Sequence, residues 1–323
     1  MGISCSVIIT SWNGRHLLAT CLPPLLKALR ASGAGWELIL VDDASTDGTS
    51  DFVRREFPDI RLLRLQRNVG FVAANNLAAN EARGEMLLLL NNDVVVTHEF
   101  LAPLLRHFTR AEVFAVCPRI VNQPPGEPSP TPNVPVYPHG LVFFLWLDGS
   151  PKLREPPNFA YPVTFASGAA VVYRRSKFLQ LGCFDSILEP AFWEDVDVCY
   201  RAWKRGWESW CEPRSIVYHR PSSSYDRKLS RRSKRLLWER NRIVFNWKNI
   251  TDLSFTIRHI LWLPARIVWS AAQRGSVFNQ ALCAAIPRLP AAMRRRRVEA
   301  RQALCTDRHV FRRLDEFWKG KVL

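Results

Sequence analysis

Residues 86–93 read MLLLLNND, and the rest of the chain is organised around this stretch. Its five apolar residues predict a strand buried on both faces. Asn91, Asn92 and Asp93 then end the strand with polar side chains. In open α/β sheets, ligands bind at the carboxyl ends of the strands, and a carboxylate beside two amides suits a divalent cation that also takes phosphate oxygens. The same tripeptide is typical of a plain turn, so its meaning depends on its neighbours.

Strands and helices alternate through the first part of the chain. The expected strands are at 4–10, 37–41, 60–65 and 86–90. Helices are expected at 17–31 and 71–82, and a third follows Gly48 and ends at residue 57. This alternation predicts a parallel sheet built from right-handed βαβ units. Pro23 and Pro24 are expected to kink the 17–31 helix or delay its start. The sequence has no GxGxxG after the first strand and no GxxxxGK[ST], which disfavours a dinucleotide-binding fold and a P-loop.

The middle of the chain changes character. Between residues 122 and 162 the sequence holds eleven prolines, which predicts a long and mostly irregular excursion. Around it we expect a helix at 99–109, strands at 113–117, 165–174, 208–213 and 215–219, and a helix that begins near Glu194 and ends at Arg205.

Composition indicates a near-neutral body with a basic tail. The 323 residues are 47% hydrophobic and include 12 tryptophans, which indicates a folded protein. The net charge is +16, and residues 220–323 hold 24 Lys and Arg against 7 Asp and Glu. The eight cysteines show neither CxxC nor zinc spacing, so a reducing compartment fits better than a disulfide framework. We see no secretory signal, and we discount a myristoylation pattern at Gly2 because a buried strand should follow it.

Acidic or metal-binding side chains stand at four expected strand ends or helix starts. These are Asp42-Asp43, Asp93, Glu194-Asp195 and His219. Each has a structural explanation. Asp42-Asp43 can be turn or cap residues, Asp93 can belong to a plain turn, Glu194-Asp195 can favour the positive end of a helix, and His219 can be a hydrogen-bonded histidine at the end of a strand. Their joint order and spacing favour a functional site.

That order resembles the inverting family 2 glycosyltransferases, which have the GT-A fold and use nucleotide-sugar donors. The resemblance extends from residue 6 to about residue 248 and looks closest to the bacterial rhamnosyltransferase-like branch that builds cell-surface polysaccharide. It is carried by SVIITSWNG from residue 6, LILVDDASTDGT from 38, NVGFVAANNLAANEARGEMLLLLNNDVVV from 68, FASGAAVVYRR from 165, LGCFD from 181, FWEDVDVCYRAWKRGW from 192 and IVYHRPSSS from 216.

The resemblance implies an α/β fold of the GT-A type, with a Rossmann-like, mostly parallel central sheet flanked by helices and a C-terminal basic helical extension. Residues 1–220 would form the catalytic domain. Within it we expect a nucleotide-sugar-binding half at 1–118, the Pro-rich excursion at 119–164 and an acceptor or catalytic half at 165–220. Residues 221–323 would form the extension.

Roles carried over position by position divide into three groups. Asp195 matches the catalytic base, with Glu194 beside it as a support. Asp93 and His219 match ligands of a divalent cation, Mn²⁺ or Mg²⁺, although Asn91 and Asn92 stand where the family's DXD motif is more acidic. The residues implied to border the nucleotide sugar are Thr10, Trp12, Asn13, Asp42, Asp43, Asn68, Gly70, Asn75, Asn91, Asn92 and Gly168. Asp42 and Asp43 would face the base and ribose, where a carboxylate can accept the imide N–H of uracil or thymine.

The implied reaction is a metal-dependent, inverting transfer of a sugar from a UDP- or dTDP-sugar to a hydroxyl of a glycan or lipid-linked acceptor, with rhamnose as the first candidate. One alternative is a nucleotidyltransferase on a related sheet, which the Glu194-Asp195 motif disfavours. Another is a non-catalytic nucleotide-sugar-binding or membrane scaffold protein, which the weakened Asn91-Asn92-Asp93 motif keeps open.

The basic tail has three competing explanations. The first is a platform on an anionic membrane surface, the second a solvated appendage or oligomer contact, and the third nucleic-acid binding, which ranks last because no recognised motif is present. Residues 253–272 are long enough to span a bilayer, but Arg258, His259, Pro264 and Arg266 interrupt them and favour a helix lying on the surface. Trp238, Trp247, Trp262 and Trp269 fit the level of the headgroups. The expected location is cytoplasmic, peripheral on the inner face of the cell membrane.

Overall fold

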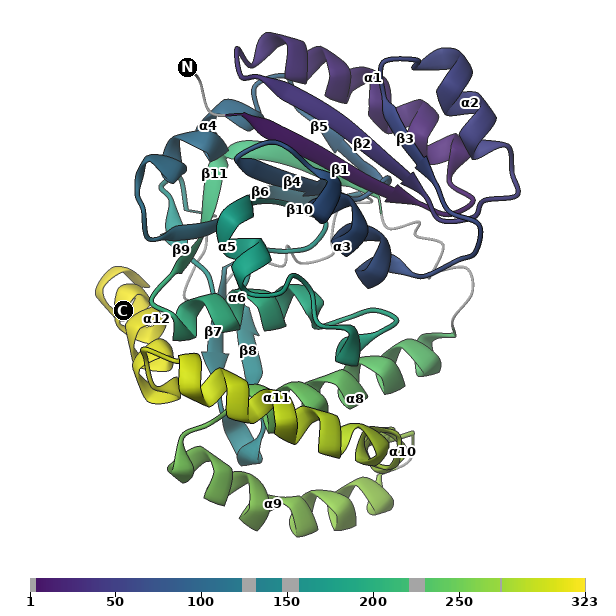
Figure 1. Ribbon diagram of the computed structural model, residues 1–323. Helices are drawn as coiled ribbons and strands as arrows, with labels where there is room; N and C mark the ends of the chain where they lie inside the picture. Colours follow the sequence, from purple (N-terminus) through teal and green to yellow (C-terminus); the bar gives the residue numbers. More distant parts are fainter. Residues whose placement is uncertain (1–3, 124–131, 147–156, 221–229, 274, 323) are drawn as a thin grey trace.

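The computed structural model describes residues 4–123, 132–146, 157–220, 230–273 and 275–322 (Figure 1). Several sequence expectations fall partly outside these ranges. They include six of the prolines of the excursion, at 124, 125, 128, 130, 151 and 156, and the first residues of the helical segment expected from 225.

A mixed sheet forms the centre of the described fold. Its strand order is β3-β2-β1-β4-β10-β6-β11-β5, with β9 paired to β11. β1 runs parallel to β2 and β4, and β2 runs parallel to β3, as the alternation of strands and helices predicts. β10 runs antiparallel to both β4 and β6. The strands are β1 (Cys5–Ser11), β2 (Trp36–Asp42), β3 (Arg61–Arg64), β4 (Met86–Leu90), β5 (Val94–Val96), β6 (Val113–Asn122), β9 (Tyr161–Pro162), β10 (Ala170–Arg174) and β11 (Glu208–His219).

Helices cover both faces of the sheet, which explains the unbroken apolar run of β4. Leu87 and Leu89 pack into the cluster under α3, α5 and α6, whereas Leu88 and Leu90 pack into the cluster under α1, α2 and α4. Successive strand residues point to opposite faces, so a strand between two helical layers needs apolar residues at every position. The helices are α1 (Arg15–Ala31), α2 (Thr49–Glu56), α3 (Phe71–Glu81), α4 (Leu101–Arg106), α5 (Arg175–Gln180) and α6 (Glu194–Lys204).

Some local expectations were wrong. α1 begins at Arg15, before the expected start, and continues through Pro23 and Pro24. The strand expected at 165–174 begins only at Ala170, because the Asn133 side chain accepts the N–H groups of Thr164 (2.8 Å) and Phe165 (3.2 Å) and holds this stretch as a loop. The two strands expected at 208–213 and 215–219 form the single strand β11, with an irregular register between Glu212 and Ile216.

The described part of the Pro-rich excursion is more ordered than expected. It contains an antiparallel pair, β7 (Asn133–Val136) and β8 (Phe143–Trp146), joined through a 3₁₀ turn, η2 (Pro138–Gly140). Phe144 packs 5.5 Å from Trp193, next to the expected catalytic pair. The pair of strands therefore links the excursion to α6.

The C-terminal extension is helical, as expected. Figure 1 shows it on the side of the molecule away from β1 and β2, with α9 farthest from the sheet. Phe245, Phe278 and Leu314 of the extension belong to the same hydrophobic cluster as Tyr200 of α6, so the helices share a core with the sheet. They are α8 (Arg231–Asn249), α9 (Leu253–Ala272), α10 (Phe278–Ala285), η4 (Ile286–Arg288), α11 (Leu289–Gln302) and α12 (Asp307–Val322).

Within the residues that the structure describes, no helix combines the length and the hydropathy needed to cross a membrane.

Candidate active site

The carboxyl ends of β1 and β4 meet at one edge of the sheet. There the Asn92 amide donates a hydrogen bond of 2.9 Å to the Ser11 hydroxyl. Gly14 lies against both groups, since a Cβ at this position would come within 2.4 Å of Asn92 Nδ2 and 2.5 Å of Ser11 Oγ. The tight approach explains why glycine ends the SWNG motif, and it brings the turn after β1 beside Asn91-Asn92-Asp93.

Asp42 and Asp43 are both buried, and both hold neighbouring loops. Asp42 accepts the Ser45 N–H at 2.9 Å and the Ser50 hydroxyl. Asp43 accepts backbone N–H groups from the loop before α3, at 2.7 Å from Val69 and 2.9 Å from Gly70. Asp42 is thus a turn residue but not the N-cap of α2, which is Gly48, and contact with a nucleotide base stays a prediction for Asp42 and Asp43.

Further polar residues tie the loops of this edge together. The backbone of Asn13 has a φ of 50°, and its side-chain oxygen accepts the Thr46 N–H at 2.8 Å. The Asn75 amide donates to the Phe71 carbonyl at 2.8 Å and lies 3.4 Å from the Thr10 hydroxyl. The Asn68 amide donates to the Asp43 carbonyl at 3.3 Å. These hydrogen bonds connect the expected nucleotide-binding residues at the ends of β1 and β2 with those before and within α3.

Asp93 and His219 come together although they are far apart in sequence. β5 pairs with β11, and His219 is the register partner of Val94. His219 Nε2 lies 3.4 Å from Asp93 Oδ1, and Nδ1 lies 3.2 Å from the Asn122 side-chain oxygen. A carboxylate and an imidazole at this separation can face one cation. In the described ranges no group of three or more His, Cys, Asp or Glu could hold a metal, so such an ion would need other ligands as well.

Asp195 is held rigidly at the start of α6. Its Oδ2 accepts the Gly168 N–H at 2.9 Å, and its Oδ1 accepts the Val196 N–H at 2.8 Å. Burial raises the pKa of Asp195, and these two N–H donors lower it in part. A Cβ on Gly168 would lie 3.4 Å from Oδ2, so the glycine allows the loop to approach the carboxylate closely.

Glu194 is next to Asp195 in the chain, but its carboxyl group has a different environment. Its side chain is buried, and Oε2 has no hydrogen-bond partner among the described residues. Burial, followed by the charge of Asp195, raises the pKa of Glu194 to about 8. The neutral form of Glu194 is therefore favoured, beside an Asp195 carboxyl whose two N–H donors favour its charged form. Two neighbouring carboxyl groups in different environments can serve different roles in acid–base chemistry.

The turn before α6 is strained and is supported by α8. Phe192 and Trp193 both have a φ of 74°, which is costly for bulky residues. The Asn241 amide nitrogen lies 2.6–2.9 Å from the carbonyl oxygens of Leu188, Ala191 and Phe192. Asn241 thereby holds the backbone that presents Glu194 and Asp195. The sequence offered no signal for this support, because Asn241 lies about fifty residues further along.

A buried ion-pair network anchors α6 to α8. Asp197 accepts Arg201 Nε at 2.8 Å, Lys248 Nζ at 2.7 Å and the Asn249 amide at 2.8 Å. Burial alone would raise the pKa of Asp197, but Lys248 and Arg201 outweigh it and bring the pKa to about 2. Since Asp197 is on α6 and Lys248 on α8, the pair fixes α6, which carries the expected catalytic residues, to the extension.

An open α/β sheet with polar side chains at its strand ends, facing a rigid carboxyl pair, defines an enzyme-like protein that binds ligands at the sheet edge. The family model described as Glycosyl transferase family 2 matches residues 6–182. The chain therefore belongs to glycosyltransferase family 2.

Relatives with assigned names agree with this membership. The chain is 31% identical over 199 residues to the pre-mycofactocin glycosyltransferase of Mycobacterium tuberculosis, covering 60% of this chain and 39% of the relative. It is 26% identical over 201 residues to polypeptide N-acetylgalactosaminyltransferase 6 of Bos taurus, covering 57% and 32%. It is 28% identical over 236 residues to an O-antigen biosynthesis protein of Myxococcus xanthus, covering 68% and 17%. The chain thus spans less than half of the length of each.

Solved structures confirm the expected GT-A fold class. GalNAc-T7 with UDP, GalNAc and Mn²⁺ superposes with a TM-score of 0.62 at 17% identity, covering 99% of this chain and 58% of that one. The mannosyltransferase of Pyrobaculum calidifontis in complex with GDP-Man and Mn²⁺ superposes with a TM-score of 0.54, also at 17% identity, covering 93% and 85%. At this identity the likeness concerns the fold.

Proposed function

We propose that the chain is a metal-dependent, inverting glycosyltransferase that moves a sugar from a nucleotide-sugar donor to a hydroxyl of a glycan or lipid-linked acceptor. The observation that carries the proposal is the pair Glu194 and Asp195, in which the Asp195 carboxyl is fixed by two N–H donors and burial raises the pKa of Glu194. Family membership supports the same reaction.

Asp195 acts as the base in this scheme. As the acceptor oxygen bonds to the anomeric carbon, its proton passes to the Asp195 carboxylate. The bond from that carbon to the diphosphate oxygen breaks at the same time, and the electron pair leaves with the nucleoside diphosphate. A single displacement inverts the configuration at the anomeric carbon. The neutral Glu194 can donate a hydrogen bond without competing for the proton.

Asp93 and His219 would hold the cation, Mn²⁺ or Mg²⁺. Their spacing and their donor types, one carboxylate oxygen and one imidazole nitrogen, fit such an ion. When bound, the ion supplies positive charge beside the diphosphate. Asn91 and Asn92 add no negative charge, so Asp93 would carry most of the electrostatic attraction.

The donor is a UDP- or dTDP-sugar in this proposal, with rhamnose as the first candidate sugar. A carboxylate oxygen has two lone pairs, so Asp43 can accept an imide N–H while it still accepts from Val69 and Gly70. The O-antigen biosynthesis protein among the relatives supports a role in cell-surface polysaccharide.

A thermal-shift panel tests the donor proposal. UDP, dTDP, GDP and their common sugars are each added with and without Mn²⁺, since a ligand of the folded state raises the melting temperature. We expect a shift with one pyrimidine diphosphate sugar that depends on the metal and is lost in Asp93→Asn. Absence of a shift with every ligand at saturating concentration would favour a non-catalytic scaffold.

The extension would rest on an anionic membrane surface at the inner face of the cell membrane. The support lies in α9, whose buried residues are the polar His259 and Ser270, while Leu253, Leu261 and Val268 are 70–73% exposed. A water-exposed helix normally shows the reverse arrangement. His259 is held inside by Trp247 Nε1, which donates to its Nε2 at 3.0 Å, and its Nδ1 lies 2.8 Å from the Gly140 carbonyl.

A further inference from the structure

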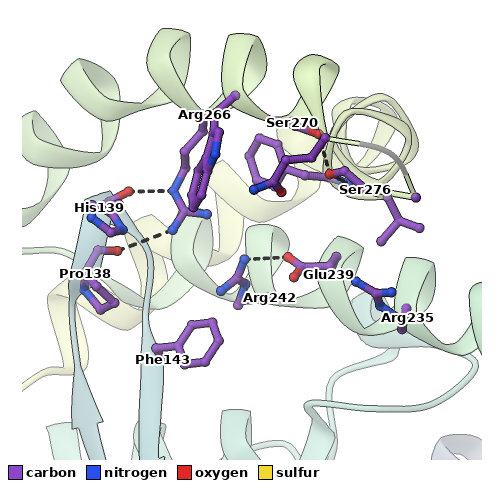
Figure 2. Close-up of a pocket in the computed structure, with 14 residues that line it drawn as sticks. Pro138, His139, Phe143, Arg235, Glu239, Arg242, Arg266, Ser270 and Ser276 are labelled. Atoms are coloured by element: carbon purple, nitrogen blue, oxygen red, sulfur yellow. Dashed lines mark hydrogen bonds and ion pairs between the residues drawn. The ribbon is translucent and has the colours of Figure 1, made fainter.

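A cavity of about 500 Å³ lies outside the candidate active site, between α8, α9 and the strand β8 (Figure 2). Arg235, Glu239 and Arg242 reach it from α8, Arg266 and Trp269 from α9, and Phe143 from β8. We call it the arginine pocket. Three guanidinium groups face one carboxylate here, so the lining carries an excess of positive charge.

Arg242 is the unusual residue of the arginine pocket. It is only 2% exposed, and its Nε and Nη1 have no hydrogen-bond partner within the described part of the chain. Its Nη2 donates to Glu239 at 2.5 Å, and its guanidinium carbon lies 4.9 Å from the Phe143 ring and 5.3 Å from the Trp238 ring. Buried charged donors without acceptors are costly. An oxyanion in the cavity would satisfy them.

Arg266 faces the same space from α9. Its Nε donates to the His139 carbonyl at 2.7 Å and its Nη2 to the Pro138 carbonyl at 3.4 Å, which holds the side chain over the cavity (Figure 2). Burial, followed by the charge of Arg242, lowers the pKa of Arg266 to about 10. Arg266 therefore stays charged at neutral pH, and the charge of Arg242 disfavours it until an anion enters.

The surroundings of the arginine pocket restrict the ligand. Trp269, which lines the pocket, is 57% exposed, and Trp262, one turn before Arg266 on α9, is 42% exposed and has its ring 4.7 Å from that of His139. On the opposite side, Trp238 lies 5.2 Å from Trp193, the residue immediately before Glu194. The pocket is thus bordered by exposed aromatic rings of α9 on one side, and on the other the rings of Trp238 and Trp193 connect Arg242 to the start of α6.

We propose that the arginine pocket binds the phosphate or diphosphate group of a lipid-linked acceptor, with the lipid chain lying against the exposed rings of Trp262 and Trp269 on α9. Guanidinium groups match phosphate oxygens in geometry and charge. The inference rests on the proposed glycosyltransferase function and extends it, because it identifies the anionic group by which the acceptor is held.

Vesicle binding of the full chain tests the proposal. The probes are neutral phosphatidylcholine vesicles with and without a few mole per cent of a polyprenyl diphosphate, and inorganic diphosphate is the soluble competitor. We expect the polyprenyl diphosphate to increase binding at least tenfold. Arg266→Gln should abolish the increase, whereas Arg312→Gln, which removes the same charge from a 65% exposed side chain on α12, should keep it. Glu239→Gln should raise the affinity severalfold, because it removes the competing carboxylate. A gain of this kind would not arise from damage to the fold.

Three results would overturn the proposal. One is equal binding by Arg266→Gln and Arg312→Gln at matched melting temperatures. Another is an unchanged or weakened affinity in Glu239→Gln. The third is tight binding of inorganic diphosphate with no gain from the lipid, which would point to a soluble anion. The assay contains no donor and no metal, so it can succeed or fail independently of the donor panel. A chain that binds donor but fails here would keep the proposed function and lose this inference.

Discussion

At the scale of single residues, Asp195 carries the strongest prediction. Asp195→Asn keeps the shape of the side chain and an acceptor for the Gly168 N–H, but it cannot take a proton. We expect turnover to fall by roughly 10²- to 10⁴-fold, with the donor-induced thermal shift retained. Release of nucleoside diphosphate in the presence of acceptor measures the effect. Asp315→Asn on α12 is the control, and equal turnover by the two variants would remove Asp195 from the role of base.

The raised pKa of Glu194 predicts that the stability of the fold depends on pH. This pKa rises from 4.5 to about 8 on folding, so the folded state binds the proton more tightly and stability falls as pH rises through that interval. Glu194→Gln mimics the protonated acid and removes this loss. We therefore expect the melting temperature of the variant, relative to the parent, to increase from pH 4.5 to pH 8. A difference that stays constant across the interval would contradict the buried, protonated state.

At the scale of elements, the link between α6 and α8 predicts a large effect on stability. Asp197→Asn would leave the buried Arg201 without its anionic partner and Lys248 with Asp185 alone, at 2.6 Å, and breaking a buried pair in this way typically costs about 3–5 kcal/mol. Denaturant unfolding measures the change. Asp315, whose ion pair with Lys319 is about half exposed, is the matched control, and Asp315→Asn should cost less than about 0.5 kcal/mol. Similar losses in both variants would show that the buried network contributes little.

The docking of α9 depends on Gly140. A Cβ there would lie 2.8 Å from the Arg258 carbonyl oxygen and the His259 Cα, and its φ is +76°. Gly140→Ala should lower the hydrogen-exchange protection of α9 amides. Gly182→Ala is the control, since Gly182 has a φ of +78° with nothing within 4 Å of its Cβ position, so it isolates the cost of the dihedral, about 1–2 kcal/mol. Unchanged protection of α9 in Gly140→Ala would mean that the turn can move without releasing the helix.

At the scale of the whole molecule, charge and apolar surface predict membrane binding. The full chain should pellet with phosphatidylglycerol vesicles at low salt and less so as salt rises, because screening weakens the attraction to anionic lipid. The double variant Leu261→Glu and Val268→Glu should abolish pelleting. Leu304→Glu, at a residue 80% exposed away from α9, should not. Failure of the full chain to pellet at low salt would favour the solvated appendage, whereas pelleting that survives the double variant would remove the apolar face of α9 from the contact with lipid.

Much of the fold could be predicted because short-range patterns carry it. The apolar run of β4, the alternation of strands and helices up to residue 90 and the helix at 253–272 all follow from local periodicity, and the structure has them. The candidate site was predictable as residue types at strand ends. The errors occur where a tertiary contact overrides local pattern, as when Asn133 keeps residues 165–169 out of β10.

The sequence by itself determined which residues could carry chemistry, since their types and order are local facts that a family resemblance can recognise. Only the tertiary structure decided how they are used. It brought His219 to within 3.4 Å of Asp93, raised the pKa values of Glu194 and Asp195 by burial, and left Arg242 buried with unpaired donors. Distance, desolvation and hydrogen-bond satisfaction depend on segments that meet only in space, so no pattern along the chain contains them.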